Sequence, residues 1–404
     1  MALLKNIWSR KGLWGKSYRS TLIQTVKFVL LRILTWHFKH KPTGVVIIRN
    51  DHLGDILISL SLIEQAAAIA HRRAQTITVV TSSGGHELLR NCTYIDNLVV
   101  CDYSDLSSGI WNRIKEYRKI TCYQAQKVIL LPSLGRSGES DYLALLPPGK
   151  QHYAIETMNV WSVEAAVREY RAHFFNFFYD FLLDYDKACT VRENEARLLS
   201  FAMEEIIYPK KGSSDHLGEF PPCQISECPY ILVVPGSFAP GRRWPAERFA
   251  AVVDRILAEY PSLSVVISGS SSDNETAEKL LAHSRSREKI INLCGKSTLR
   301  QLFSNVKNAE FIISNDTGTI HVAAILEKKC FCIGGNWHYG AYNPDPFCPS
   351  NIFINADTPC RHCFEKCHAL AEERFSCLML VTVEKVTQTI FREISPSAAK
   401  ESRF

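Results

Sequence analysis

The strongest constraint on the fold is an alternation between short apolar runs and helical stretches, which occurs twice along the chain. Four β-branched runs fall between residues 44 and 132, and segments of helical composition separate them. The alternation restarts at 230–237 ("YILVVPGS") and continues through 310–315 ("EFIISN"). Strands that alternate with helices predict βαβ units and parallel sheets. We therefore expect an α/β protein with two doubly wound, Rossmann-like domains and a ligand cleft between them.

The length of the chain agrees with two domains. A chain of 404 residues exceeds one typical core. Residues 209–229 collect Pro, Gly and Ser and are typical of a linker, whereas 154–208 is rich in aromatic residues and is expected to be helical. The predicted parts are an N-terminal arm (1–41), a first domain (42–208), a linker (209–229), a second domain with a cysteine-rich tail (230–390) and a terminal tail (391–404).

The N-terminal arm carries the positive charge of the protein. Residues 1–41 hold nine Lys or Arg and no Asp or Glu, so the formal charge of +6 leaves −3 for the rest. The apolar stretch 21–38 is interrupted by Lys27 and Arg32, which makes it a poor spanning helix. An apolar helix flanked by cations is typical of a segment that lies in an anionic membrane surface. The alternative is a helix that docks on the protein's own core.

The fourteen cysteines divide into two groups. Most sit in or beside apolar segments, as buried free thiols do, and we expect a reducing compartment. Four late cysteines form C-x2-C-x3-C-x9-C, a spacing compatible with a structural metal site, with disulfides or with packed free thiols; these are Cys360, Cys363, Cys367 and Cys377. None of them is expected to be catalytic.

Three strand-to-helix loops are candidates for binding an anion, because unpaired N–H groups at the start of a helix favour phosphate. In "SNDTGTIHVAA", Thr317 is expected to cap a helix and Gly318 to let the backbone approach a ligand. Asp316 is placed to accept bonds from sugar hydroxyls, and His321 lies one turn inside the helix. The alternative is a capped helix with a core histidine.

The other two loops carry a basic pair and a carboxylate. "PGSFAPGRRWP" places Ser237 before Arg242 and Arg243, and arginine offers bidentate recognition of phosphate; the alternative is a solvated basic turn. "RNDHLGDILISL" places Asp55 after Gly54 at the start of a helix. Asp55 is either a partner of the helix dipole or a general base.

Several signatures are absent from the sequence. It contains no G-x-G-x-x-G after the first strand and no G-x-x-x-x-G-K-[ST], which disfavours dinucleotide and P-loop sites. The Asp-x-Asp triplet at 184–186 lies in surroundings expected to be helical, so we interpret it as a decoy and not as a metal site. We expect no cofactor and no metal.

The three loops, in this order, resemble glycosyltransferase family 9, the heptosyltransferases of lipopolysaccharide core assembly. The resemblance covers roughly residues 44–390 and rests on "RNDHLGDILISLSLI", "PGSFAPGRRWPAERF" and "NDTGTIHVAA". It implies a GT-B architecture and an inverting, metal-independent transfer from ADP-heptose to a lipid-linked saccharide. In that architecture, domain 42–208 is expected to bind the acceptor and domain 230–390 the nucleotide sugar. It also implies roles for single residues: Asp55 as the base, Ser237 and Arg242 on the diphosphate, and Asp316, Thr317, Gly318 and His321 around the donor.

The chain departs from the family pattern in three places. Arg242 stands where Lys is often found, which keeps the charge but changes the geometry. The basic arm is outside the usual family core, and the aromatic "NWHYGAYNPDP" (336–346) replaces a simpler loop. A peripheral enzyme on the cytoplasmic side of the inner membrane would use the arm to meet a lipid-linked acceptor; no nucleic acid partner is expected. Two alternatives to the transferase are a nucleotide-sugar epimerase of GT-B type and a non-catalytic nucleotide-sugar-binding protein.

Overall fold

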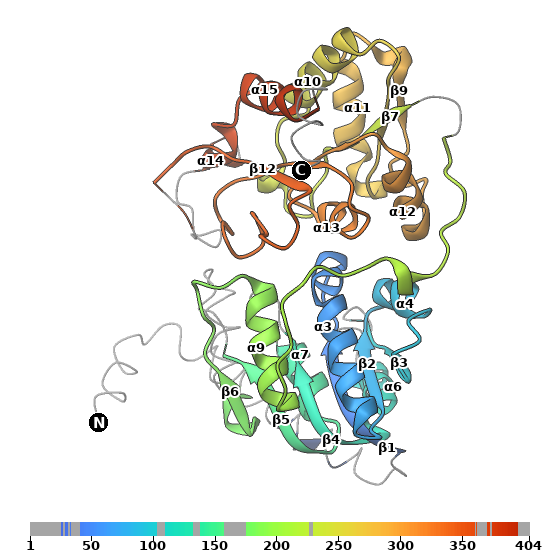
Figure 1. The fold of residues 1–404 in the computed structure, drawn as a ribbon, viewed down its shortest axis with the longest axis vertical. Coiled ribbons are helices and arrows are strands. Elements are labelled where there is room, and N and C mark those ends of the chain that lie inside the picture. Colours follow the sequence, from blue (N-terminus) through green and yellow to red (C-terminus); the bar gives the residue numbers. More distant parts are fainter. Residues whose placement is uncertain are drawn as a thin grey trace, which may run out of the picture. The chain divides into compact units, whose positions relative to one another are not determined.

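A computed structural model of the protein shows two compact units (Figure 1). It describes residues 26, 29, 30, 33, 41–102, 110–131, 138–156, 175–225, 229–359, 361, 370–371 and 374–394. The first unit contains the chain up to His52, Leu62–Asp186 and Val191–Tyr208, and the second contains Leu53–Ser61, Lys187–Thr190 and the chain from Pro209. Most of the arm and three of the four late cysteines (Cys360, Cys363 and Cys367) lie outside the described residues. The predicted domain limits stay a prediction.

The first unit is built on a six-stranded parallel sheet with the order β3-β2-β1-β4-β5-β6. Its elements are β1 (Lys41–Arg49), α3 (Leu53–Arg72), β2 (Ile77–Thr81), α4 (Ser83–Leu89), β3 (Asn97–Val100), α6 (Ile110–Thr121), β4 (Tyr123–Leu130), α7 (Gly138–Leu145), β5 (Gly149–Ile155), β6 (Phe181–Leu183) and α9 (Val191–Met203). Successive side chains of a strand point to opposite faces, and Val46 and Ile48 of β1 pack in one cluster with Tyr117 of α6 and Leu143 of α7. Both faces of β1 are buried, which explains its continuous apolar run.

The expectation that 154–208 is helical was wrong for two described segments of that range. β5 extends to Ile155, and Phe181–Leu183 forms the edge strand β6, whose residues pair with Tyr153–Ile155. Val191–Met203 forms the α-helix α9, as expected. Aromatic residues and leucine suit both states, and pairing with β5 decided the outcome.

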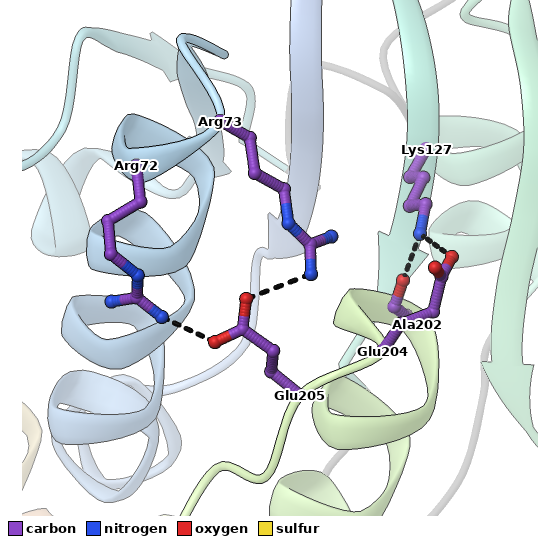
Figure 2. Close-up of polar contacts among 6 residues, drawn as sticks. All are labelled: Arg72, Arg73, Lys127, Ala202, Glu204 and Glu205. Carbon is purple, nitrogen blue, oxygen red and sulfur yellow. Dashed lines mark hydrogen bonds and ion pairs between the residues drawn. The ribbon is translucent and has the colours of Figure 1, made fainter.

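The end of α9 is held against α3 and β4 by ion pairs (Figure 2). The carboxylate of Glu205 accepts hydrogen bonds from Arg72 and from Arg73, the latter over 2.9 Å. Lys127 of β4 donates to Glu204 over 2.6 Å and to a carbonyl in the last turn of α9 over 2.5 Å. Glu204 takes a left-handed conformation (φ 57°), which ends the helix. These pairs set the point at which the chain leaves the first unit.

The second unit repeats the same topology. Its six-stranded parallel sheet has the order β12-β11-β10-β7-β8-β9, which read from the other edge is the strand order of the first. Its main elements are β7 (Tyr230–Val234), η3 (Pro240–Arg242), α10 (Ala246–Glu259), β8 (Ser264–Ile267), α11 (Asn274–His283), β9 (Ile290–Asn292), α12 (Leu299–Asn308), β10 (Ile312–Asn315), α13 (Gly318–Ile325), β11 (Cys330–Ile333), β12 (Asn351–Ile354) and α15 (Val383–Ile394). The predicted α/β class with two doubly wound domains is confirmed.

The helices of the second unit are stabilised by packing on the sheet and, in α12, by a capping box. Ile231 and Val233 of β7 pack with Phe249 of α10 and Ile390 of α15 on one face of the sheet. α12 begins with a reciprocal capping box, in which the Thr298 side chain accepts from the backbone of Gln301 and Gln301 returns a bond.

One described helix is long and apolar enough to cross a membrane by length and composition. It is α3, and 72% of its apolar stretch is buried inside the protein. α3 is therefore best understood as a core helix of the fold.

Candidate active site

Two of the three predicted loops lie side by side at the carboxyl ends of the two central strands of the second sheet. The loop with Ser237 and Arg242 follows β7, and the loop with Asp316 follows β10. β7 and β10 are neighbouring parallel strands whose following helices diverge, because strand order reverses between them. Ligands of doubly wound sheets bind at such a switch point, outside the carboxyl ends of the strands.

Asn315 joins the two loops. Its buried side chain donates from Nδ2 to the carbonyl of Pro235 over 2.6 Å, and its Oδ1 accepts from the backbone N–H of Trp244 over 3.1 Å. A buried amide satisfied on both sides fixes the separation of the segments it bonds. The sequence analysis missed this residue; the signal was an Asn at the end of an apolar strand.

The two arginines of the second loop have different surroundings. Arg243 donates from Nε to the carbonyl of Ser237 over 2.8 Å, and its Nη2 lies 3.7 Å from Oδ1 of Asp273. Arg243 is therefore engaged in holding the loop. Arg242 ends η3, and its positive charge acts on His338. The assignment of Arg242 to a phosphate stays a prediction.

Glycine is required at position 236 because the backbone there packs closely against Asp273. A β-carbon at this position would lie 2.2 Å from Cγ of Asp273. Asp273 cannot retreat easily, because its Oδ2 accepts from the backbone N–H of Ser270 over 2.9 Å and from the Ser270 hydroxyl over 2.7 Å. The backbone beside Ser237 thus runs close to the start of α11.

The start of α13 differs from the prediction in one respect. Thr317 occupies the N-cap position, but its side chain makes no capping hydrogen bond, and its Oγ1 lies 3.3 Å from the hydroxyl of Ser314. The expectation that Thr317 caps the helix through its side chain was therefore wrong. The extended Thr317 backbone nevertheless begins the helix, and the first N–H groups of α13 retain the polarity that attracts anions.

His321 and Gly318 meet the first turn of α3, whose residues Leu53–Ser61 group with the second unit. A β-carbon on Gly54 would lie 2.7 Å from Cδ2 of His321 and 3.5 Å from Cα of Gly318. Glycine at 54 and 318 permits this close approach of two helix starts. His321 is 8% exposed. The predicted first and third motifs are thus brought together.

Asp55 lies in that same first turn and is 8% exposed. Its Oδ1 accepts a hydrogen bond from the hydroxyl of Tyr342 over 2.9 Å. Asp55 therefore follows Gly54, which meets His321, and its carboxylate bonds to a phenol from a distant part of the chain. The sequence analysis noted the aromatic segment 336–346 but did not predict Tyr342 as a partner of Asp55.

We call residues 336–346, between β11 and β12, the aromatic loop. Besides Tyr342, it supplies Asn343, whose Nδ2 donates to Oδ1 of Asp316 over 2.9 Å. It also supplies His338, whose pKa is lowered to about 3 by burial and by the charge of Arg242. The aromatic loop therefore interacts with one residue of each predicted motif: it bonds to Asp55 and Asp316, and the charge of Arg242 acts on His338.

The predicted absence of a metal site rested partly on a wrong premise. Asp184–Asp186 follows the strand β6 and is not inside a helix. Within the described ranges, however, no three His, Cys, Asp or Glu side chains are grouped so that they would hold a metal ion. Cys377 is buried, and its sulfur accepts from the backbone N–H of Asn336 over 3.4 Å.

Two doubly wound units of equal topology are typical of the GT-B class of glycosyltransferases. A family model of glycosyltransferase family 9 (heptosyltransferase) matches residues 158–372, which is slightly more than half of the chain. The chain belongs to this family, as its motifs predicted. The match does not include the loop with Asp55.

Individual relatives are similar over different lengths. Lipopolysaccharide heptosyltransferase 2 of Salmonella typhimurium is 32% identical over 123 residues, 30% of this chain and 33% of that protein. The chain therefore aligns with about a third of the length of this curated relative. The structure of E. coli ADP-heptose lipopolysaccharide heptosyltransferase II has a TM-score of 0.61 at 19% identity and covers 89% of this chain and 99% of that one.

A second solved structure gives a similar result. E. coli heptosyltransferase WaaC with ADP-2-deoxy-2-fluoro heptose has a TM-score of 0.60 at 16% identity, covering 87% of this chain and 99% of that one. At these identities the structural likeness establishes the fold.

Proposed function

We propose that this protein is an inverting, metal-independent glycosyltransferase that moves heptose from ADP-heptose onto a lipopolysaccharide core or a related lipid-linked glycan. The observation that carries the proposal is the position of Asp55, a buried carboxylate that follows Gly54, the residue that meets His321 and Gly318 at the start of α13. A single displacement at the sugar carbon needs one base for the acceptor and a site for the departing diphosphate. Family membership and the solved relative with an ADP-heptose analogue support heptose and ADP as the donor.

In the proposed reaction, Asp55 accepts the proton of an acceptor hydroxyl as its oxygen attacks the anomeric carbon of the donor. The new bond forms on the face opposite the diphosphate, the bond to the diphosphate oxygen breaks, and ADP leaves. Arg242 and the N–H groups at the start of α13 stabilise the charge that develops on ADP. Ser237 assists on the diphosphate, while Asp316, Thr317, Gly318 and His321 surround the donor.

Transfer by the purified protein tests this function. Incubation with ADP-heptose and a heptose-free core acceptor, in the presence of EDTA, is expected to release ADP and to add one heptose to the acceptor. Asp55→Asn is expected to lose activity by roughly 10²- to 10⁴-fold, with ADP binding measured by thermal shift unchanged. Transfer only from UDP- or GDP-sugars would mean that the donor is not ADP-heptose. Loss of transfer in the presence of EDTA would contradict metal independence. An active Asp55→Asn enzyme would refute Asp55 as the base.

We also propose that the N-terminal arm attaches the protein to the cytoplasmic face of the inner membrane. The described residues of the arm, Val26, Val29, Leu30 and Ile33, are helical and follow the i, i+3, i+4, i+7 spacing of one helix face. Each is 47–58% exposed. An exposed apolar stripe in a strongly basic segment is typical of a helix in an anionic interface.

A further inference from the structure

The proposed reaction does not use the aromatic loop, although this loop holds the proposed base. The Tyr342 hydroxyl donates to Oδ1 of Asp55 over 2.9 Å, and the two residues are 287 positions apart in the sequence. A carboxylate only accepts hydrogen bonds, so the phenol must be the donor. A hydrogen bond from a fixed donor restricts rotation of the carboxylate.

Tyr342 is itself held in place. Its ring contacts the rings of two histidines, with centroid distances of 6.3 Å to His321 and 5.7 Å to His338. The next residue, Asn343, is 3% exposed and bonds to Asp316 over 2.9 Å. Contacts on both sides therefore fix the position of the phenolic oxygen relative to Asp55.

The start of the loop is anchored as well. Asn336 is 1% exposed and donates from Nδ2 to the carbonyl of Ala356 over 3.0 Å and to the Thr358 hydroxyl over 2.7 Å. Trp337 beside it is fully buried. A loop anchored in this way is able to impose a fixed geometry on the side chain that it bonds.

We propose that Tyr342 is a positioning residue for Asp55: its hydroxyl fixes one carboxylate oxygen and so directs the other oxygen to the acceptor hydroxyl. The inference rests on the proposed function, because it assigns Asp55 the role of base. It assigns Tyr342 no contact with the donor. Loss of the phenolic hydroxyl should therefore slow turnover and leave donor binding intact.

Tyr342→Phe tests this role, since the variant removes only the hydroxyl. Tyr339→Phe is the matched control: it removes a hydroxyl from the same loop and keeps the ring, which lies 4.4 Å from the guanidinium carbon of Arg361. Tyr342→Phe is expected to lower kcat by roughly tenfold or more, the usual scale for a hydrogen bond to a charged group. The Kd for ADP and the melting temperature should stay within error, and Tyr339→Phe should match the original protein in every measurement.

The outcomes separate this inference from the function on which it rests. An unchanged kcat in Tyr342→Phe, with Asp55→Asn inactive, overturns the role of Tyr342 and keeps Asp55 as the base. A weaker Kd for ADP with unchanged kcat also overturns it, because Tyr342 would then belong to the donor site. Full activity of Asp55→Asn overturns the proposed base itself.

Discussion

Acidification should destabilise this protein through His338 of the aromatic loop. Burial and the nearby Arg242 lower the pKa of His338 from 6.5 to about 3 in the folded protein. Unfolding restores the ordinary value. Between these two pKa values the unfolded chain binds a proton that the folded protein does not, so stability is present above pH 6.5 and is lost as the pH falls. From about pH 7.5 to about pH 5, the loss from this one group is about 2 kcal/mol.

The measurement compares melting temperatures at these two pH values. A loss of this size corresponds to roughly 4–8 °C for a unit of about 200 residues. His338→Gln removes the titrating group. Between about pH 7.5 and about pH 5, the melting temperature of this variant should therefore fall by roughly 4–8 °C less than that of the original protein. His283→Gln, which changes an exposed histidine, is the control and should keep the original pH dependence. Because all other groups titrate equally in the three proteins, their contributions cancel in the comparison.

Equal pH dependence in His338→Gln and the original protein would refute the reasoning. It would mean that the imidazole is solvated, or that Arg242 does not act on it. A smaller loss in the original protein than in the variant would require a raised pKa for His338, with an acidic partner in place of the arginine.

Two further predictions concern the second motif and the arm. Gly236→Ala should destabilise the protein by roughly 1–3 kcal/mol through overpacking against Asp273 and weaken ADP binding, measured by thermal shift. Gly84→Ala is the control, because a β-carbon there meets nothing within 4 Å, and it should be neutral or slightly stabilising; equal effects would exclude the packing argument. Replacing both Val26 and Leu30 by Asp should release the protein from vesicles of anionic phospholipid in a flotation assay, while its activity on a soluble acceptor stays the same. Unchanged flotation would contradict attachment through this stripe.

Much of the fold could be predicted because its signals are local. The β-branched runs of β1 and β7, with helical stretches between strands, depend only on side chains near in sequence. Parallel strands buried on both faces leave continuous apolar runs, and these are visible without a structure. The strand β6 was missed for the same reason: "FLL" in an aromatic context has no period of its own, and only its pairing with β5 defines it.

The chemical types of the site residues could be predicted from the sequence, but their contacts could be predicted only in part. Asp55, Ser237, Arg242 and Asp316 each follow a strand, and strand ends are where doubly wound proteins bind ligands. The division of work between Arg242 and its neighbour depends on Asp273, which comes from the start of another helix. The family resemblance selects Arg242, but the contacts of Arg243 with Ser237 and Asp273 are visible only in the structure.

By itself, the sequence determined the α/β class, the repeated domain plan and the residue types available for holding a diphosphate and accepting a proton. These properties follow from short-range periodicity and from motifs of a few residues. Only the tertiary structure decided that Asn315 joins two loops, that His321 packs against Gly54, and that Tyr342 bonds to Asp55. Such contacts join residues up to 287 positions apart, and they depend on sheet order and on side-chain directions that no local pattern encodes.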